Sequence, residues 1–191
     1  MSIKILVLYG TARPNSNSEA YTHAFIEGIK ETKQVEVTEI NLAKKKLNGC
    51  LACYACKSKE GVFCVQNDGF VEIMNQMLSS DIVIFAFPVY WYAIPGEIKN
   101  YIDRTVCLWD DPTYSIKPSL KQQFSQIKFV CISNCAEDNK EWCERAAFPV
   151  KCFVESYCGQ YHEIDLPGSD YDFKKNQKQL EKCKNEGKSF L

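Results

Sequence analysis

The chain has 191 residues, of which 46% are hydrophobic, enough for one domain with a sizeable buried core. Its 23 basic and 24 acidic side chains leave a net charge of -1, which gives no general attraction for nucleic acid or anionic lipid. The first apolar run, residues 3–8, is too short for a signal-peptide core or a membrane span. We therefore expect a cytoplasmic protein without nucleic-acid or membrane partners.

The first third of the chain predicts a strand, a helix and a second strand. Residues 3–9 form a nearly continuous apolar run rich in branched side chains, typical of a central strand covered on both faces. A polar loop over 10–18 leads into an amphipathic helix over 19–33, and residues 35–40 alternate like an edge strand. A cysteine-rich insertion over 42–67 then interrupts the alternation of strands and helices.

The remaining two thirds continue this alternation. The expected elements are a helix over 69–79, a strand over 81–87, a helix from Pro95 to Arg104, a strand over 127–133, a helix over 139–155, a strand over 157–166 and a final helix over 173–188. Residues 105–123, which contain Trp109, Pro112, Tyr114 and Pro118, are expected to be irregular.

Strands that alternate with helices predict an α/β domain with a doubly wound, five-stranded parallel sheet. The semi-polar second strand belongs at an edge, so we expect the strand order 2-1-3-4-5. In this order, ligands bind at the carboxyl ends of strands 1 and 3. The loops over 10–18 and 88–94 are therefore the first places to look for a site.

The first of these loops is rich in hydrogen-bond donors. Hydroxyl groups, side-chain amides and one arginine, just before a helix N-terminus, suit a phosphate group; the residues are Thr11, Arg13, Asn15, Ser16, Asn17 and Ser18. Helix capping is the alternative, because Ser16 and Glu19 match the capping-box pattern. The loop matches neither a Walker motif nor the dinucleotide-binding glycine fingerprint.

The second loop places three aromatic side chains beside the same crevice. Large flat rings suit a planar conjugated ligand; the loop residues are Pro88, Val89, Tyr90, Trp91 and Tyr92. Ordinary core or interface aromatics are the alternative.

Four cysteines, Cys50, Cys53, Cys56 and Cys64, lie close together in the insertion. The spacing C-x2-C-x2-C resembles the way bacterial ferredoxins present ligands to an iron-sulfur cluster, here with a local fourth cysteine. A structural zinc ion or free, redox-active thiols are the alternatives. The other seven of the 11 cysteines show no ligand-like spacing and are interpreted as small, semi-buried hydrophobic residues.

These motifs together resemble a known family. The first loop is similar to the GS-x-R-x-x-x-N-[ST] loop of flavodoxin-like NAD(P)H-dependent FMN reductases, with Thr11, Arg13, Asn17 and Ser18 at matching positions. Residues 88–104 look like the P-x-Y-[WF]-x-x-x-P-x-x-[LI]-K-x-[FY]-[IL]-D-R segment of that family. The cysteine spacing is similar to the C-x2-C-x2-C-x4-7-C motif of the iron-sulfur flavoproteins within it.

The resemblance implies a flavodoxin-like domain over residues 1–191 that binds FMN, with the phosphate on residues 11–18 and the isoalloxazine ring against residues 88–92. Asn134 and Cys135 are expected near the ring edge. It also implies a [4Fe-4S] cluster on the four cysteines, in a homodimer or homotetramer where the cluster of one subunit faces the flavin of another.

The implied activity is an FMN-dependent oxidoreductase that moves electrons from NAD(P)H, or from a protein donor such as ferredoxin, to a quinone, a nitro compound or dioxygen. No catalytic side chain is expected, because the cofactors supply the chemistry. The alternatives are a cluster-less NAD(P)H:FMN or quinone reductase and a flavodoxin-like electron carrier.

Overall fold

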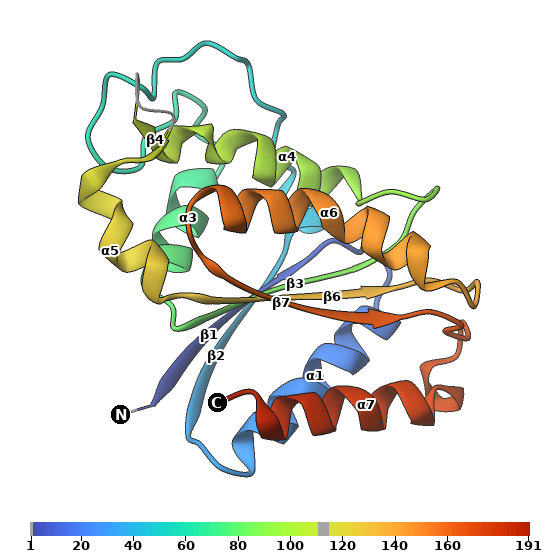
Figure 1. The fold of residues 1–191 in the computed structure, drawn as a ribbon. Coiled ribbons are helices and arrows are strands. Elements are labelled where there is room, and N and C mark those ends of the chain that lie inside the picture. Colours follow the sequence, from blue (N-terminus) through green and yellow to red (C-terminus); the bar gives the residue numbers. More distant parts are fainter. Residues whose placement is uncertain (1, 111–114) are drawn as a thin grey trace.

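The five predicted strands form one parallel β-sheet in the computed structural model, which describes residues 2–110 and 115–191 (Figure 1). The strands are β1 (Ile3–Tyr9), β2 (Val35–Asn41), β3 (Ile82–Pro88), β6 (Lys128–Asn134) and β7 (Gln160–Leu166). Their order is β2-β1-β3-β6-β7, with every neighbouring pair parallel. This is the predicted order 2-1-3-4-5, and the predicted flavodoxin-like α/β class is confirmed.

Helices cover both faces of the sheet (Figure 1). On one face lie α1 (Asn17–Lys30) and α7 (Gln177–Ser189); on the other lie α3 (Phe70–Leu78), α4 (Gly96–Arg104), α5 (Pro118–Gln126) and α6 (Lys140–Ser156). Two apolar cores result, one on each side. In β1, for example, Leu6 and Leu8 belong to the core under α3 and α4, whereas Ile5 and Val7 belong to the core under α1 and α7.

The burial of each strand follows its position in the sheet. All but the last residue of the central strand β3 are fully buried, as expected for a strand covered on both faces. The edge strand β2 is mostly exposed or half-buried, which confirms its predicted position. Among the helices of the described segments, none is both long and apolar enough to cross a bilayer.

The segment over 105–123 is more regular than expected. It contains a short 3-10 helix, η1 (Thr105–Leu108), the paired two-residue strands β4 (Trp109–Asp110) and β5 (Ser115–Ile116), and the start of α5. Pro118 begins α5 because its missing N–H costs nothing in the first turn of a helix. Leu120 and Phe124, one turn apart, bury the inner face of α5. Pro112 and Tyr114 lie outside the described residues.

Two further short elements complete the chain. The four-residue helix α2 (Leu42–Lys45) follows β2, and η2 (Phe173–Lys175) precedes α7. Between α2 and α3 the chain runs through the segment that carries the four clustered cysteines, which we call the cysteine loop (residues 46–69).

Helices α1 and α7 approach each other closely at two glycines. A methyl group at Gly187 would lie 2.0 Å from the carbonyl oxygen of Phe25, and one at Gly28 would lie 2.1 Å from that of Lys184. Both obstacles are backbone atoms within helices, so they cannot move aside as a flexible side chain would. The backbones of the two helices are therefore in direct contact.

Replacing Gly187 with alanine should destabilise the protein by about 2 kcal/mol, because the added methyl group forces the two helices apart. Urea denaturation measures the change as a lower unfolding midpoint. Gly96→Ala is the matched control, since a methyl group there meets no atom within 4 Å. Equal midpoints for wild type and Gly187→Ala would contradict this account of the helix contact.

Candidate functional site

Loops that follow four strands, β1, β3, β6 and β7, meet at the carboxyl end of the sheet, at the right of Figure 1. They enclose a cavity of about 280 Å³. Nine of the predicted cofactor residues line it: Thr11, Arg13, Ser16, Asn17, Ser18, Pro88, Val89, Tyr90 and Asn134. Cys135, expected near the ring edge, lines it as well. Asn15 instead lines a shallower hollow next to Arg13 and Tyr171.

The first loop combines capping with open donors. Ser16 Oγ accepts a hydrogen bond from the Glu19 N–H at 3.2 Å, and Glu19 Oε2 accepts one from the Ser16 N–H at 3.1 Å. The capping box is therefore present. It leaves the N–H groups of Asn17 and Ser18 in the first turn of α1, where a helix has no carbonyl one turn back to receive them. Ser16, predicted to contact a phosphate, thus serves as the helix cap, whereas the N–H groups of Asn17 and Ser18 lie outside the capping box.

Asn134 connects the loop to the sheet. Its side-chain Nδ2 donates to Ser18 Oγ at 2.9 Å and to the Phe87 carbonyl at 3.2 Å, while its backbone carbonyl accepts from the Val89 N–H at 2.8 Å. All of these groups are buried or half-buried. One side chain at the end of β6 therefore fixes the start of α1 relative to the loop after β3.

A segment from the far end of the chain covers the first loop. Arg13 Nη2 donates to the Tyr171 carbonyl at 3.1 Å, and Asn17 Nδ2 donates to the Asp170 carbonyl at 2.7 Å. Ser169 and Tyr171 also line the cavity. These residues could not be predicted from the sequence, because a contact across more than 150 positions leaves no local pattern.

The second loop is a tight turn with a strained backbone. Tyr90 and Ala93 exchange two backbone hydrogen bonds of 3.0 Å, and between them Trp91 and Tyr92 have φ angles of 52° and 61°. Glycine and asparagine normally occupy such left-handed positions. Each non-glycine residue there costs roughly 1–2 kcal/mol. The turn projects Trp91 into solvent, with 93% of its surface exposed.

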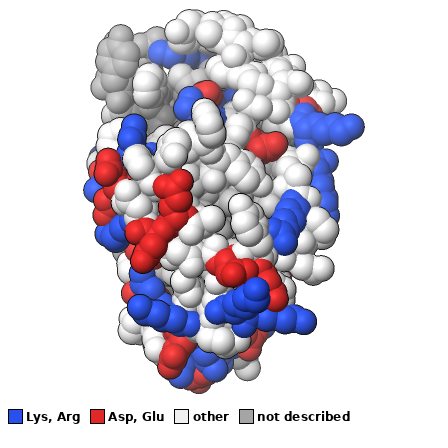
Figure 2. All heavy atoms as spheres, turned by 90° about the vertical axis from the view of Figure 1, so that its right-hand side faces the viewer, with Lys and Arg blue, Asp and Glu red and all other residues white. Residues whose placement is uncertain are grey.

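A second cavity adjoins the first at Val89, Cys135 and Ala136. Trp91, Tyr92 and Trp142 line it, and the rings of Tyr92 and Trp142 meet edge to face at 4.5 Å between centroids. Trp142 was predicted as a helix residue but not as a site residue. Figure 2 views this end of the molecule: charged side chains are sparse over its upper half and dense at its lower end.

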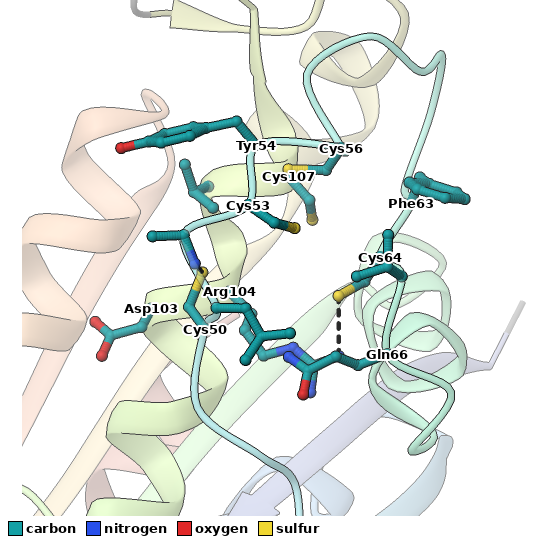
Figure 3. A pocket seen from close by; sticks show the side chains of 14 residues that line it. Cys50, Cys53, Tyr54, Cys56, Phe63, Cys64, Gln66, Asp103, Arg104 and Cys107 are labelled. Atoms are coloured by element: carbon teal, nitrogen blue, oxygen red, sulfur yellow. Dashed lines mark hydrogen bonds between the residues drawn. The ribbon is translucent and has the colours of Figure 1, made fainter.

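The four clustered cysteines line a separate cavity of about 140 Å³ between the cysteine loop and the end of α4. Figure 3 shows the sulfurs of Cys50, Cys53, Cys56 and Cys64 around it, together with that of Cys107 from η1. Burial raises the pKa of Cys56, and it raises the pKa of Cys107 to about 12. Cys107 was interpreted from the sequence as a small hydrophobic residue, and its place beside the cluster was missed.

Arg104 forms the floor of this cavity. It is 2% exposed, and it donates to Asp68 Oδ2 at 2.6 Å. It also donates to Cys64 Sγ at 3.2 Å (Figure 3). Burial is the largest single influence on Asp68 and opposes its ionisation, but the hydrogen bond and charge of Arg104, together with hydrogen bonds from the Asn48 and Phe70 N–H groups, hold the Asp68 pKa below its ordinary value. The Nε of Arg104 is buried without a hydrogen-bond partner in the described structure.

A second buried cation supports the cysteine loop from behind. Lys117 is 5% exposed, and its Nζ donates to three carbonyl oxygens: those of Cys56 at 3.1 Å, Lys59 at 2.7 Å and Gly61 at 2.9 Å. The ammonium group is thus fully satisfied by the loop's own backbone. Lys117 was not singled out from the sequence, because a lysine beside a proline carries no such signal.

The thiols line the cavity without converging on one point. Within residues 2–110 and 115–191, no three His, Cys, Asp or Glu side chains come close enough to share a single metal ion.

Replacing Lys117 with methionine should loosen the cysteine loop, because one buried and two partly buried carbonyl groups lose their donor. A buried polar group left unsatisfied costs about 1–3 kcal/mol. Limited proteolysis should then cut within residues 56–61 faster than in wild type. Lys121→Met, on the exposed face of helix α5 that follows Lys117, is the control and should be cut at the wild-type rate. Unchanged cleavage in Lys117→Met would contradict the supporting role of the ammonium group.

Comparison with known proteins identifies relatives that are named iron-sulfur flavoproteins. The chain is 30% identical over 122 residues to an iron-sulfur flavoprotein of Archaeoglobus fulgidus, covering 64% of this chain and 51% of that protein. It is 33% identical over 106 residues to an iron-sulfur flavoprotein of Methanosarcina thermophila, covering 56% and 54% respectively. The chain spans about half the length of these curated relatives.

Among solved structures, the NAD(P)H:quinone oxidoreductase from Methanothermobacter marburgensis has the same fold. Its TM-score is 0.72 at 14% sequence identity, over 100% of this chain and 98% of that one. A model of the NADPH-dependent FMN reductase family matches residues 3–127, which include both predicted loops and the cysteine loop. The resemblance stated from the motifs is therefore confirmed: the chain belongs to the NADPH-dependent FMN reductase family of oxidoreductases.

Proposed function

We propose that the chain binds FMN in the cavity at the carboxyl end of the sheet and works as an NAD(P)H-dependent oxidoreductase. The observation that carries the proposal is the cavity between β1 and β3, where the predicted phosphate residues and the predicted ring residues meet. Its position is the one at which doubly wound sheets bind ligands. Family membership supports the identity of the cofactor.

The first loop suits the phosphate end of FMN. The free N–H groups at the start of α1 and the positive end of the helix dipole favour an anion. Thr11, Ser16 and Ser18 are buried there, and Arg13 adds the only full positive charge among the described lining residues of this cavity. Asn134 holds the two sides of the cavity at a fixed separation.

The second loop and the adjoining cavity suit a flat ring. Tyr90 borders the first cavity and Tyr92 and Trp142 the second, so a ligand that spans both lies against aromatic side chains. When bound, FMN supplies hydride acceptance and electron release in one-electron or two-electron steps. The protein's task is then to bind and orient its cofactor, and no general base is required of its side chains.

We further propose that the cysteine cavity holds a [4Fe-4S] cluster on Cys50, Cys53, Cys56 and Cys64. Each cysteine of such a cluster binds a different iron atom. Four sulfurs spread around a cavity therefore suit a cluster better than they suit a single metal ion. Thiolates and cluster together are anionic, and the cations Arg104 and Lys117 lie directly beside them. The unpartnered Nε of Arg104 and the names of the two relatives also support this assignment. A cluster there supplies one-electron transfer.

A homodimer or homotetramer is part of the proposal. Leu51 and Tyr54 at the cysteine cavity are 64% and 61% exposed, and Trp91, in the tight turn after β3, is more exposed still. Exposed apolar side chains at both cavities suit an arrangement in which the cysteine cavity of one subunit faces the flavin cavity of another. Electrons then pass from NAD(P)H, or from a protein such as ferredoxin, to a quinone, a nitro compound or dioxygen.

Anaerobic purification followed by an absorption spectrum and iron analysis tests both cofactors together. We expect flavin bands, a broad iron-sulfur absorbance, and about four irons per chain. Flavin without iron would refute the cluster and leave a cluster-less reductase; no flavin uptake would refute the FMN site. NAD(P)H oxidation with a quinone as acceptor separates an enzyme from an electron carrier.

Replacing Arg13 with glutamine should weaken FMN binding about tenfold to a hundredfold, because a charge-assisted hydrogen bond to phosphate contributes roughly 1.5–3 kcal/mol. Quenching of flavin fluorescence during titration measures the affinity. Lys33→Gln, an exposed change far from the cavity, should bind as wild type does. Equal affinity in Arg13→Gln and wild type would contradict the assignment of the phosphate loop.

A further inference from the structure

Two cysteines outside the cysteine loop lie in sulfur–sulfur contact. Cys135, immediately after β6, and Cys143, in the second turn of α6, place their Sγ atoms 3.6 Å apart. Cys135 is the first residue of the short loop 135–139 that joins β6 to α6, and Cys143 lies in the helix beyond that loop. Their approach is therefore a product of the fold, and a disulfide between them needs side-chain adjustment rather than displacement of an element.

The two thiols differ in access. Cys135 is partly exposed and lines both adjoining cavities, whereas Cys143 is fully buried beneath it. A reagent that enters the cavity reaches Cys135 first, and Cys143 then lies behind it. This is the arrangement of an attacking thiol with a resolving thiol at its back.

We propose that Cys135 and Cys143 form a reversible disulfide at the wall of the two cavities. The oxidant is a low-molecular-mass disulfide, such as oxidised glutathione. Cys135 loses its proton and attacks one sulfur of that disulfide, which releases one small thiol and forms a mixed disulfide. Cys143 then loses its proton, attacks the Cys135 sulfur and releases the second small thiol. Two protein thiols are oxidised and one small disulfide is reduced to two thiols.

Burial governs the rate of this exchange. It raises the pKa of Cys135, and it raises that of Cys143 to about 12, so both are thiols at neutral pH. The pair is thus slow to react on its own and needs sustained exposure to oxidant.

Oxidation of Cys135 would change the contacts that hold the aromatic side chains of the second cavity. The Cys135 S–H donates to the Glu137 carbonyl at 3.1 Å, and Glu137 Oε2 accepts from Trp142 Nε1 at 2.7 Å. Trp142 in turn packs against Tyr92. A disulfide removes the S–H donor at the start of this chain of contacts. Its effect on FMN rests on the proposed function, but its formation does not.

The test uses the full-length chain without added flavin, incubated with oxidised glutathione, alkylated and digested with trypsin. Cleavage after Lys128, Lys140 and Arg145 places Cys135 and Cys143 on separate peptides, residues 129–140 and 141–145. We expect these peptides to be linked, and dithiothreitol to separate them. Both cysteines alkylated, while cysteine-loop thiols are oxidised, would overturn the proposal.

Three variants assign the linkage. Cys135→Ser and Cys143→Ala should lose it, and Cys131→Ala should retain it, although Cys131 lies on the same peptide as Cys135. A linkage that persists in Cys135→Ser would overturn the proposal, and circular dichroism establishes that each variant is folded. Because no flavin is present, a chain that forms the linkage but fails to bind FMN would support the disulfide while refuting the proposed function.

Discussion

The reversal of strand order at β1 and β3 is the constraint on which the cavity at the carboxyl end of the sheet and the cysteine cavity both depend. After β1 the chain turns to α1 on one face of the sheet, and after β3 it turns to α4 on the other. The two loops must therefore separate, and a crevice opens between them. Asn134 spans it by hydrogen bonds to both sides. Helix α4 begins at Gly96, after the tight turn at Trp91 and Tyr92, and ends at Arg104 beside the cysteines. The two ends of the helix are about 12 Å apart along its axis.

The cysteine loop has little regular structure of its own and depends on two cations supplied by other elements. Arg104 reaches it from α4 through Asp68 and Cys64, and Lys117 reaches it from the start of α5 through three carbonyls. Buried charges are costly unless they are paired or hydrogen-bonded. Both cations meet that condition through their hydrogen bonds to the loop, so the loop's shape and the burial of these two side chains depend on each other.

The strands and most helices could be predicted because each follows from a local pattern: continuous apolar runs for β1 and β3, alternation for β2, and helical spacing for α6 in spite of Pro149 within it. Helix α5 was missed because nearby prolines suggested irregular structure, although Pro118 in fact begins the helix. The loops that line the candidate site were predictable from strand ends. Tyr171, Trp142, Cys107 and Lys117 were not, because their roles arise from contacts between segments distant in sequence.

The left-handed turn at Trp91 and Tyr92 has a consequence for how the protein would respond to selection for thermal stability. Glycine at either position relieves backbone strain, so a screen for resistance to heat should favour it. The same change removes an aromatic ring from the cavity wall. Stability and the proposed role of these two residues in binding a flat ring thus make opposite demands on the turn.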